Sequence, residues 1–241
     1  MIVKICRECQ NEFNVFLSRD SQRYCSHSCF MKDRNKANPE LRYSARTKRR
    51  FNISNEVRIY IDGLLLGDAS IQKGTSHATR LTQTFSRNHL DWAEKIHNDL
   101  KVFGIESMIG SYDIFDKRTN EIYHTVYLQT KFYPEFKIFY SKWYYRGKKE
   151  VPEDIILNSI SITNWFLGDG SRPNGKIQLS TDSFSLQSIN ILREGFKQLS
   201  FKFYYNNNNG RMYLYKKKEV SKFIDLIERT PESFYYKLGV V

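Results

Sequence analysis

The sequence predicts an α+β fold in which two related units, each with the element order αββαββα, follow a small cysteine-rich module. Three observations support this prediction. A motif of one form occurs twice, at residues 61–70 and 162–171, and ends each time in Leu-Gly-Asp-small-Ser. The same succession of helical and alternating stretches follows each copy. All four cysteines lie within the first thirty residues. Because tandem copies of one plan pack against each other, we expect approximate twofold symmetry.

Each unit is expected to open with the motif helix. In the first unit this helix covers 57–67 and is capped by Ser54. The patterns that follow predict strands at 80–86 and 177–185, further strands around 123–129 and 211–215, and closing helices near 134–144 and 220–229. The helix between the strands carries one apolar stripe in each unit, made of Leu90, Ala93, Ile96 and Leu100 in the first and Leu186, Ile189, Leu192 and Phe196 in the second.

Composition narrows the class of protein. The 241 residues are 40% hydrophobic and 15% aromatic, which excludes a disordered chain and allows a real core. The net charge is +12 and the pI about 9.4, which favours polyanionic partners, nucleic acid above all. No apolar run approaches the roughly 18 residues of a membrane span. We therefore expect no membrane partner and an intracellular, soluble protein, in a bacterial or phage cytoplasm or an organelle matrix.

The four cysteines have metal-ligand spacing: Cys6 and Cys9 form C-x2-C, and Cys25 and Cys29 form C-x3-C fifteen residues later. Two short-spaced pairs of thiolates can close a tetrahedral structural Zn²⁺ site, and so short a segment needs the ion to fold. The alternatives are free thiols or disulfides, and His27 could replace one cysteine. We expect four segments: a four-cysteine zinc-finger module at 1–36, a basic linker at 37–53, a first αββαββα unit at 54–151 and a second at 152–241.

We interpret the basic linker as a segment that contacts DNA. Few apolar residues interrupt its charges, so an extended strand that follows phosphates is favoured over a solvated tether. The predicted contacts within it are Arg46, Lys48, Arg49 and Arg50.

The motif helix carries glycines that need an explanation. Gly63 and Gly67 lie four apart on one face, and a glycine inside a helix costs about 1 kcal/mol relative to alanine. Close approach of another backbone is the simplest reason. Because the second copy has Asn164 and Gly168 at the matching places, we expect the two motif helices to pack against each other there.

Such packing would bring Asp68 and Asp169 together at two helix C-termini. A carboxylate is disfavoured there by about 0.3–1 kcal/mol, and two neighbouring carboxylates repel each other. Divalent cations relieve both penalties, and oxygen ligands of this kind suit Mg²⁺, which also binds phosphate oxygens. The plain alternative is that both aspartates are helix caps or turn residues. Their equivalent places in a repeat favour the metal-binding interpretation.

The two motifs resemble the paired signatures of the LAGLIDADG homing endonucleases in their single-chain form, and the resemblance covers about 51–241. Two flanking segments agree with it: 148–152, Lys-Lys-Glu-Val-Pro, and 233–238, which ends in Tyr-Lys-Leu. The sequence departs from the family pattern at Ala69, where glycine is usual, and at Leu66 and Leu167, where the family name has an acid.

The resemblance implies a saddle of two four-stranded sheets over the DNA major groove. It implies that Asp68, Asp169, Lys149 and Lys237 are catalytic, with Asp68 and Asp169 binding Mg²⁺ and the carbonyls of Gly67 and Gly168 assisting. Arg–guanine and Gln–adenine pairings are favoured by geometry. The expected base-reading residues are Arg80, Thr82, Gln83, Gln129, Gln178, Ser180, Arg211 and Tyr213. The alternative for each is an ordinary solvent-facing strand residue.

Three functions fit this reading. The leading one is a site-specific double-stranded DNA endonuclease of a mobile element, active as a monomer on a long asymmetric target. The first rival is an RNA maturase that assists group I intron splicing and binds the host intron RNA. The second rival is a catalytically inactive DNA-binding regulator of the same fold.

Overall fold

A computed structural model describes residues 1–37, 49–74 and 79–239 of the chain. The chain forms two compact units, Met1–Arg49 and Arg50–Val241. The predicted DNA contacts Arg46 and Lys48 lie outside the described residues, and the finer segment boundaries stay predictions. Among the described residues, no helix has both the length and the apolar character that crossing a bilayer requires.

The N-terminal unit is a small hairpin followed by a helix. Strand β1 (Ile2–Ile5) pairs antiparallel with β2 (Glu12–Val15), the short turn η1 (Leu17–Arg19) follows, and α1 (His27–Ala37) ends the described part. Cys6 and Cys9 lie in the hairpin connection, whereas Cys25 precedes α1 and Cys29 lies in its first turn. This placement brings the two cysteine pairs to one point.

The larger unit contains the predicted repeat. The first copy comprises α3 (Asn55–Leu66), β3 (Ser70–Lys73), β4 (Thr79–Ser86), α4 (Leu90–Val102), β5 (Ser107–Asp116), β6 (Glu121–Thr130) and α5 (Phe136–Trp143). The second comprises α6 (Ser159–Asp169), β9 (Gly170–Ser171), β10 (Ile177–Ser180), α7 (Leu186–Gln198), β11 (Tyr204–Asn206), β12 (Arg211–Leu214) and α8 (Lys217–Leu226). The predicted order αββαββα is therefore confirmed in both copies.

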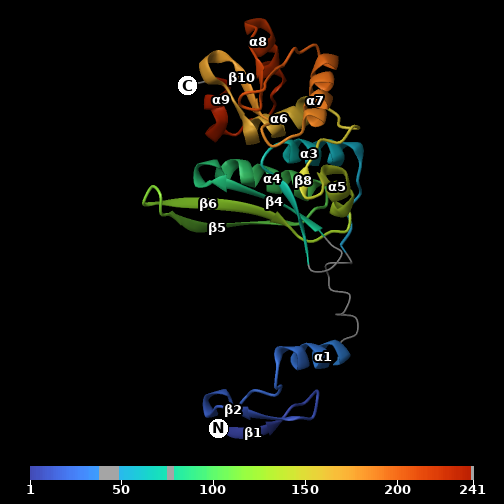
Figure 1. The fold of residues 1–241 in the computed structure, drawn as a ribbon, viewed down its shortest axis with the longest axis vertical. Coiled ribbons are helices and arrows are strands. Elements are labelled where there is room, and N and C mark those ends of the chain that lie inside the picture. Colours follow the sequence, from blue (N-terminus) through green and yellow to red (C-terminus); the bar gives the residue numbers. More distant parts are fainter. Residues whose placement is uncertain (38–48, 75–78, 240–241) are drawn as a thin grey trace. The chain divides into compact units, whose positions relative to one another are not determined.

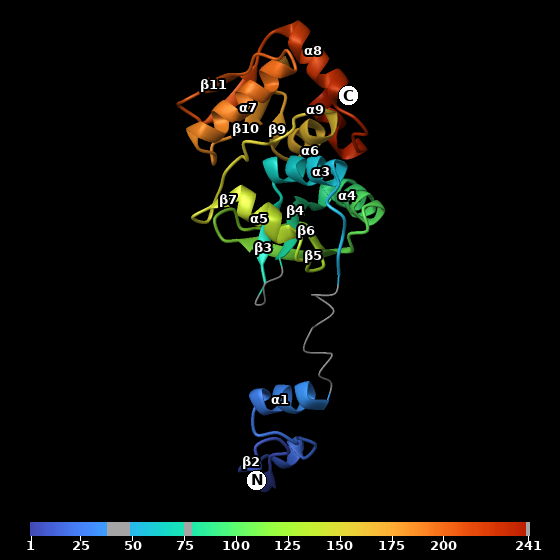
Figure 2. The same ribbon diagram turned by 90° about the vertical axis from the view of Figure 1, so that its right-hand side faces the viewer.

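The two sheets have the same topology. All their strand pairs are antiparallel, in the order β3-β4-β6-β5 in the first copy and β9-β10-β12-β11 in the second. Figures 1 and 2 show α3 and α6 side by side at the centre of this unit, with one copy on each side of them. The pseudo-symmetric α+β fold predicted from the repeat is confirmed.

Helices cover one face of each sheet and form the core. Trp92, Ala93, Ile96 and Leu100 of α4 are fully buried, as are Ile189, Leu192 and Phe196 of α7. The prediction that Leu90 and Leu186 belong to these apolar stripes is wrong, because their side chains are 39% and 65% exposed. At about 100° per residue, each of them lies about a quarter-turn away from the centre of its stripe.

Short elements outside the repeat plan position two segments of the site. The turn η3 (Arg87–His89) joins β4 to α4, and η4 (Pro173–Gly175) precedes β10. A two-residue turn joins β7 (Tyr144–Tyr145) to β8 (Lys148–Lys149), and its residues Arg146 and Gly147 both have positive φ, as a tight hairpin requires. The chain closes with η5 (Glu232–Phe234) and α9 (Tyr235–Leu238).

Candidate active site

The site begins where α3 meets α6. A Cβ atom added to Gly63 would lie 2.6 Å from Cα and 2.7 Å from the carbonyl oxygen of Ser161, so only glycine allows this approach. One turn further along, a Cβ on Gly168 would lie 3.3 Å from Cα of Gly67. Asn164 ties the pair together, because its Nδ2 donates to the carbonyl of Tyr60 at 3.1 Å. The predicted packing of the motif helices at their small residues is confirmed.

This packing brings Asp68 and Asp169 together. A Cβ on Gly168 would lie 3.3 Å from the Asp68 amide nitrogen and 3.9 Å from its Oδ2. The pKa of Asp169 is raised to about 7, first by burial and then by the charge and hydrogen bonding of Asp68, while Lys149 acts in the opposite direction. Two carboxylates that disfavour each other's charge, one exposed and one half-buried, are a donor set that could hold a hard divalent cation.

Two lysines, the half-buried Lys149 and the buried Lys237, hold the ends of the motif helices. Lys149 of β8 donates from Nζ to the carbonyls of Leu65, Gly67 and Ala69, at 2.8, 3.0 and 2.9 Å. The Leu65 carbonyl is one that the C-terminus of α3 leaves without an intrahelical partner, and the Gly67 and Ala69 carbonyls follow between α3 and β3. One of them is the Gly67 carbonyl that the family resemblance assigns to metal binding, and it is already engaged by Lys149.

Lys237 of α9 has the equivalent role in the second copy. Its Nζ donates to the carbonyls of Phe166 and Leu167, at 3.2 and 2.8 Å, and it is 6% exposed. Burial lowers the pKa of both lysines to about 8, and the aspartates partly oppose this shift. The stronger of these effects comes from Asp169 on Lys149 and from Asp68 on Lys237. Each lysine therefore holds the end of its own motif helix.

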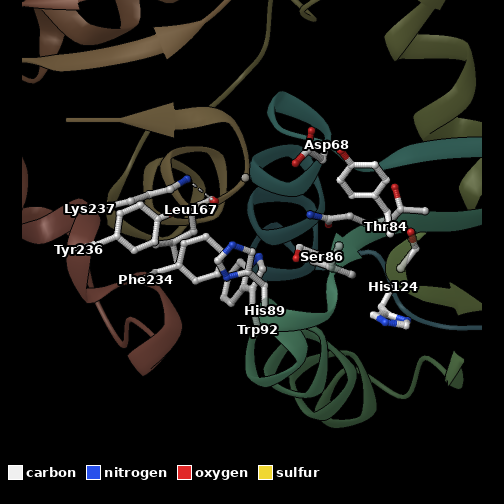
Figure 3. Close-up of a pocket in the computed structure, with 15 residues that line it drawn as sticks. Asp68, Thr84, Ser86, His89, Trp92, His124, Leu167, Phe234, Tyr236 and Lys237 are labelled. Atoms are coloured by element: carbon white, nitrogen blue, oxygen red, sulfur yellow. Dashed lines mark hydrogen bonds between the residues drawn. The ribbon is translucent and has the colours of Figure 1, made fainter. Parts of the chain in front are cut away.

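A pocket of about 390 Å³ opens beside Asp68. Figure 3 shows Phe234, from the C-terminal segment, against His89 and Trp92 of the first copy, and Lys237 directed at the Leu167 carbonyl, with Asp68 across the pocket. A second hollow of about 310 Å³ runs from Asp68 along the first sheet to Thr82 and Gln129. The candidate centre is thus open and continuous with the polar face of that sheet.

The predicted base-reading residues of the first copy divide between two faces. Thr82 pairs in register with Gln129, and Arg80 pairs with Gln72, to which its guanidinium donates at 2.9 and 3.1 Å. Because side chains alternate along a strand, Arg80, Thr82 and Gln129 share the sheet face that α4 does not cover.

Gln83 differs from the other predicted base readers. Thr82 and Gln83 are both buried, at 7% and 4% exposed, but Gln83 shares the face of Leu81 and Phe85, which is the helix-covered face of the sheet. Its Oε1 has no hydrogen-bond partner among the residues that the structure describes, and its side chain lines both hollows that contain Asp68. The alternating pattern of β4 could have placed Gln83 with Leu81 and Phe85. In the structure it belongs to the surroundings of Asp68 rather than to the open face.

The four base-reading residues predicted in the second sheet form two cross-strand pairs. Gln178 of β10 pairs with Tyr213 of β12, and Ser180 pairs with Arg211. All four side chains are partly exposed. They occupy one face, as the alternation predicts.

Sequence reasoning missed Asp182. Aligning the two copies by Phe85 and Phe184 places Asp182 opposite Gln83, and its charge contributes to the raised pKa of Asp169, after the larger effects of burial and Asp68. The signal was present in the repeat, at a position two residues before the shared phenylalanine. The two halves of the centre therefore differ beside their aspartates.

The cysteines of the N-terminal unit form one cluster. The four Sγ atoms lie within 4.8 Å of one another, and Cys25 Sγ is 3.6 Å from the sulfurs of both Cys9 and Cys29. Tetrahedral zinc with Zn–S bonds of about 2.3 Å needs sulfur separations of ~3.8 Å, so the cluster fits this ion. His27 is exposed and is not a member of the cluster.

Comparisons with known proteins agree with this architecture. An uncharacterized protein of Methanocaldococcus jannaschii is 34% identical over 186 residues, which cover 73% of this chain and 70% of that protein. The cytochrome b mRNA maturase bI2 of Debaryomyces hansenii is 26% identical over 134 residues, which cover 54% of this chain and 51% of the maturase.

Among solved structures, the homing endonuclease I-WcaI bound to its DNA recognition sequence matches with a TM-score of 0.65 at 19% identity, over 93% of this chain and 98% of that one. At this identity the likeness shows the fold alone. A sequence model of the LAGLIDADG DNA endonuclease family matches residues 58–223, well over half of the chain. The protein therefore belongs to the LAGLIDADG DNA endonuclease family.

Proposed function

We propose that the protein is a site-specific endonuclease that hydrolyses both strands of a DNA duplex with divalent metal ions held between Asp68 and Asp169. The observation that carries this proposal is the contact of α3 with α6, which forces the two carboxylates together at one open centre. A purely structural role would not explain why two carboxylates are kept together beside a half-buried and a buried lysine.

In this proposal the aspartates and the lysines of the centre have separate roles. The carboxylates of Asp68 and Asp169 hold the ions, with assistance from the carbonyls of Gly67 and Gly168. Bound Mg²⁺ supplies Lewis acidity toward the phosphate and lowers the pKa of the attacking water. Lys149 and Lys237 fix the helix ends that carry the aspartates, and their charges favour the negative charge that develops on the phosphate.

The sheets supply the recognition. We propose that their open faces form a saddle on the major groove, where Arg80, Thr82 and Gln129 read one half of the site and the second sheet reads the other. The second-sheet readers are Gln178, Ser180, Arg211 and Tyr213. Because one chain contains both halves, a monomer suffices, and because the halves differ in sequence, the target is long and asymmetric. We propose that Gln83 supports the centre beside Asp68 instead of reading a base.

The N-terminal unit extends this footprint. We propose that Cys6, Cys9, Cys25 and Cys29 bind a structural Zn²⁺, which lets this short segment fold. Arg46, Lys48, Arg49 and Arg50 then add phosphate contacts that are independent of DNA sequence. The chain's +12 charge favours such binding to a polyanion.

Cleavage can be tested on a duplex that joins the two sequences flanking the coding region, incubated with Mg²⁺. We expect a double-strand break that EDTA suppresses. Asp169→Ala should abolish cutting and leave DNA affinity largely intact. Unchanged cutting by this variant would overturn the assignment of the centre.

One rival activity has support from a specific observation. The maturase bI2 matches over about half of this chain, so RNA binding in aid of group I intron splicing is the second candidate. Tight binding to the host intron RNA, with no cutting of the flanking-sequence duplex, would favour it. The inactive-regulator reading would require DNA binding without cutting and without RNA binding.

A further inference from the structure

The segment that carries Lys237 is held by the first copy. Asp91, in the first turn of α4, accepts from the hydroxyl of Ser233 at 2.6 Å and from its amide at 3.0 Å. His89 contacts the same hydroxyl through Nδ1 at 3.1 Å, and its ring stacks on Phe234 with centroids 4.1 Å apart. Because Ser233 lies only four residues before Lys237, these contacts fix the start of the lysine's own short helix. We call this set the Asp91 clamp.

The segment that carries Lys149 is held by the second copy in the same manner. Glu150 accepts from the hydroxyl of Ser188, in the first turn of α7, at 2.7 Å, and from the hydroxyl of Ser185, which caps that helix. The amide of Val151 donates to Ser188 Oγ at 2.9 Å. Ser188 is 1% exposed and its bond with Val151 is buried, whereas the two bonds to Glu150 are partly buried. We call this set the Glu150 clamp.

The two clamps occupy equivalent places in the fold, but the carboxylate and the hydroxyl groups come from opposite partners. In the Asp91 clamp the helix start supplies the carboxylate and the lysine segment supplies the hydroxyl. In the Glu150 clamp the lysine segment supplies the carboxylate and the helix start supplies two hydroxyls. Two unlike sets of side chains at equivalent places indicate that this contact itself is required, whatever residues make it.

Each clamp joins a lysine to the other copy. Lys237 belongs to the second copy by sequence, yet it lines the same pocket as Asp68, and the Asp91 clamp ties its segment to the first copy. Lys149 belongs to the first copy, yet the Glu150 clamp ties its segment to the second copy. The lysines are therefore exchanged between the halves.

The helices that form the clamps follow the central strands of the two sheets. Strand β4 ends at Ser86, and η3 leads directly into α4. Strand β10 ends at Ser180, and a short turn leads to the cap of α7. A displacement of either sheet on a ligand would therefore be passed to the lysine of the opposite copy.

We infer that the centre consists of two exchanged half-sites, in which Asp91 and Ser233 position Lys237 for the half-site of Asp68, and Glu150 with Ser188 positions Lys149 for the half-site of Asp169. This inference rests on the proposed nuclease function. Asp91 and Glu150 are positioning residues, because each acts through a lysine and not on the DNA itself.

The test measures nicking of each strand separately, with a duplex labelled on either strand, in single-turnover reactions with Mg²⁺. Asp91→Asn and Ser233→Ala should slow one strand by on the order of tenfold to 100-fold, because misplacing a reacting group by about 1 Å has effects of that size. Glu150→Gln and Ser188→Ala should slow the other strand. Glu94→Ala on α4 and Glu153→Ala near Lys149 are matched controls at exposed positions and should slow neither strand.

Two further measurements separate positioning from a general loss of folding. In a Lys237→Met background, Asp91→Asn should add nothing to the loss on its strand, because its effect passes through the lysine. In NMR spectra of the protein without DNA, with ¹³C at lysine Cε, Asp91→Asn should move the Lys237 signal and leave the Lys149 signal in place.

The outcomes distinguish this inference from the proposed function. Failure of the unaltered protein to cut, with the selective NMR shift present, would overturn the nuclease proposal and keep the clamp. Equal slowing of both strands by Asp91→Asn, or additivity with Lys237→Met, would overturn the exchange of lysines. Absence of the selective NMR shift would overturn it as well.

Discussion

Gly63 lies against the backbone of Ser161 so closely that no side chain fits between them. An added Cβ would stand 2.6 Å from the Ser161 Cα atom, well inside van der Waals contact, whereas one on Gly67 would meet nothing nearer than 3.4 Å. The close packing of α3 on α6 therefore depends on Gly63 having a hydrogen atom in place of a side chain. The distance between Asp68 and Asp169 depends on the same contact.

Gly63→Ala is expected to destabilise the larger unit despite the better helix propensity of alanine. The propensity gain is about 1 kcal/mol, and overpacking a rigid backbone contact costs typically about 1–3 kcal/mol or more. Gly67→Ala is the matched control for unfolding, because its neighbours are at ordinary contact distance. Chemical denaturation should show a loss for the first variant well above that for the second, and equal losses would argue against the close helix contact.

Asp169 should make the metal-free protein less stable as pH rises. Burial and Asp68 raise its pKa from 3.8 to about 7, so the folded chain keeps a proton that the unfolded chain releases. Stability is then lost as pH rises between about 4 and 7 and changes no further above that range. Asp169→Asn should remove this loss, raising the melting temperature at pH 8 more than at pH 5. The same difference at both pH values would contradict the raised pKa.

The two lysines should limit cleavage at alkaline pH. Burial lowers the pKa of Lys149 and Lys237 to about 8, so the ammonium groups that bridge the helix-end carbonyls are lost above that value. We expect kcat/KM, which reports the free enzyme, to fall as pH rises above about 8. A profile that stays flat or keeps rising to pH 10 would show that the charged lysines are not needed.

The N-terminal unit should require one zinc ion and the larger unit none for its fold. Cys29→Ser removes one of four clustered thiolates, and Zn²⁺ retention measured by elemental analysis should drop from one per chain toward zero. The larger unit should keep its melting transition, because the two units have separate cores. We expect weaker DNA binding with little change in the single-turnover rate at saturating protein. Retention of stoichiometric zinc would contradict the four-cysteine site.

Much of the fold was predictable because local pattern and tertiary plan agree. The repeat fixed the order of elements, and Ser54 accepts from the Val57 amide at 3.2 Å, as the predicted cap requires. The glycine spacing in the motif predicted the helix contact. These features depend on residues close in sequence or on the comparison of one copy with the other.

What escaped prediction depends on contacts between distant segments. Nothing near Asp91 in the sequence indicates that Ser233, 142 residues away, is its partner. Gln83 was assigned to base reading from its residue type, although its place in the alternation of β4 puts it on the covered face. Asp62, inside the first motif, is 3% exposed and accepts from Trp143 Nε1 at 2.7 Å, which anchors α5 to α3. Its role depends on the packing of α5 against α3, which the sequence near Asp62 does not indicate.

The central claim is that Asp68 and Asp169 together hold the metal ions. It is tested most directly by anomalous diffraction from crystals of the protein soaked in Mn²⁺, with the duplex of the flanking sequences bound. Our account predicts Mn²⁺ peaks within coordination distance of both carboxylates, and their loss in Asp169→Asn. Manganese bound elsewhere, or no manganese between the two aspartates in crystals whose DNA has been cut, would contradict it.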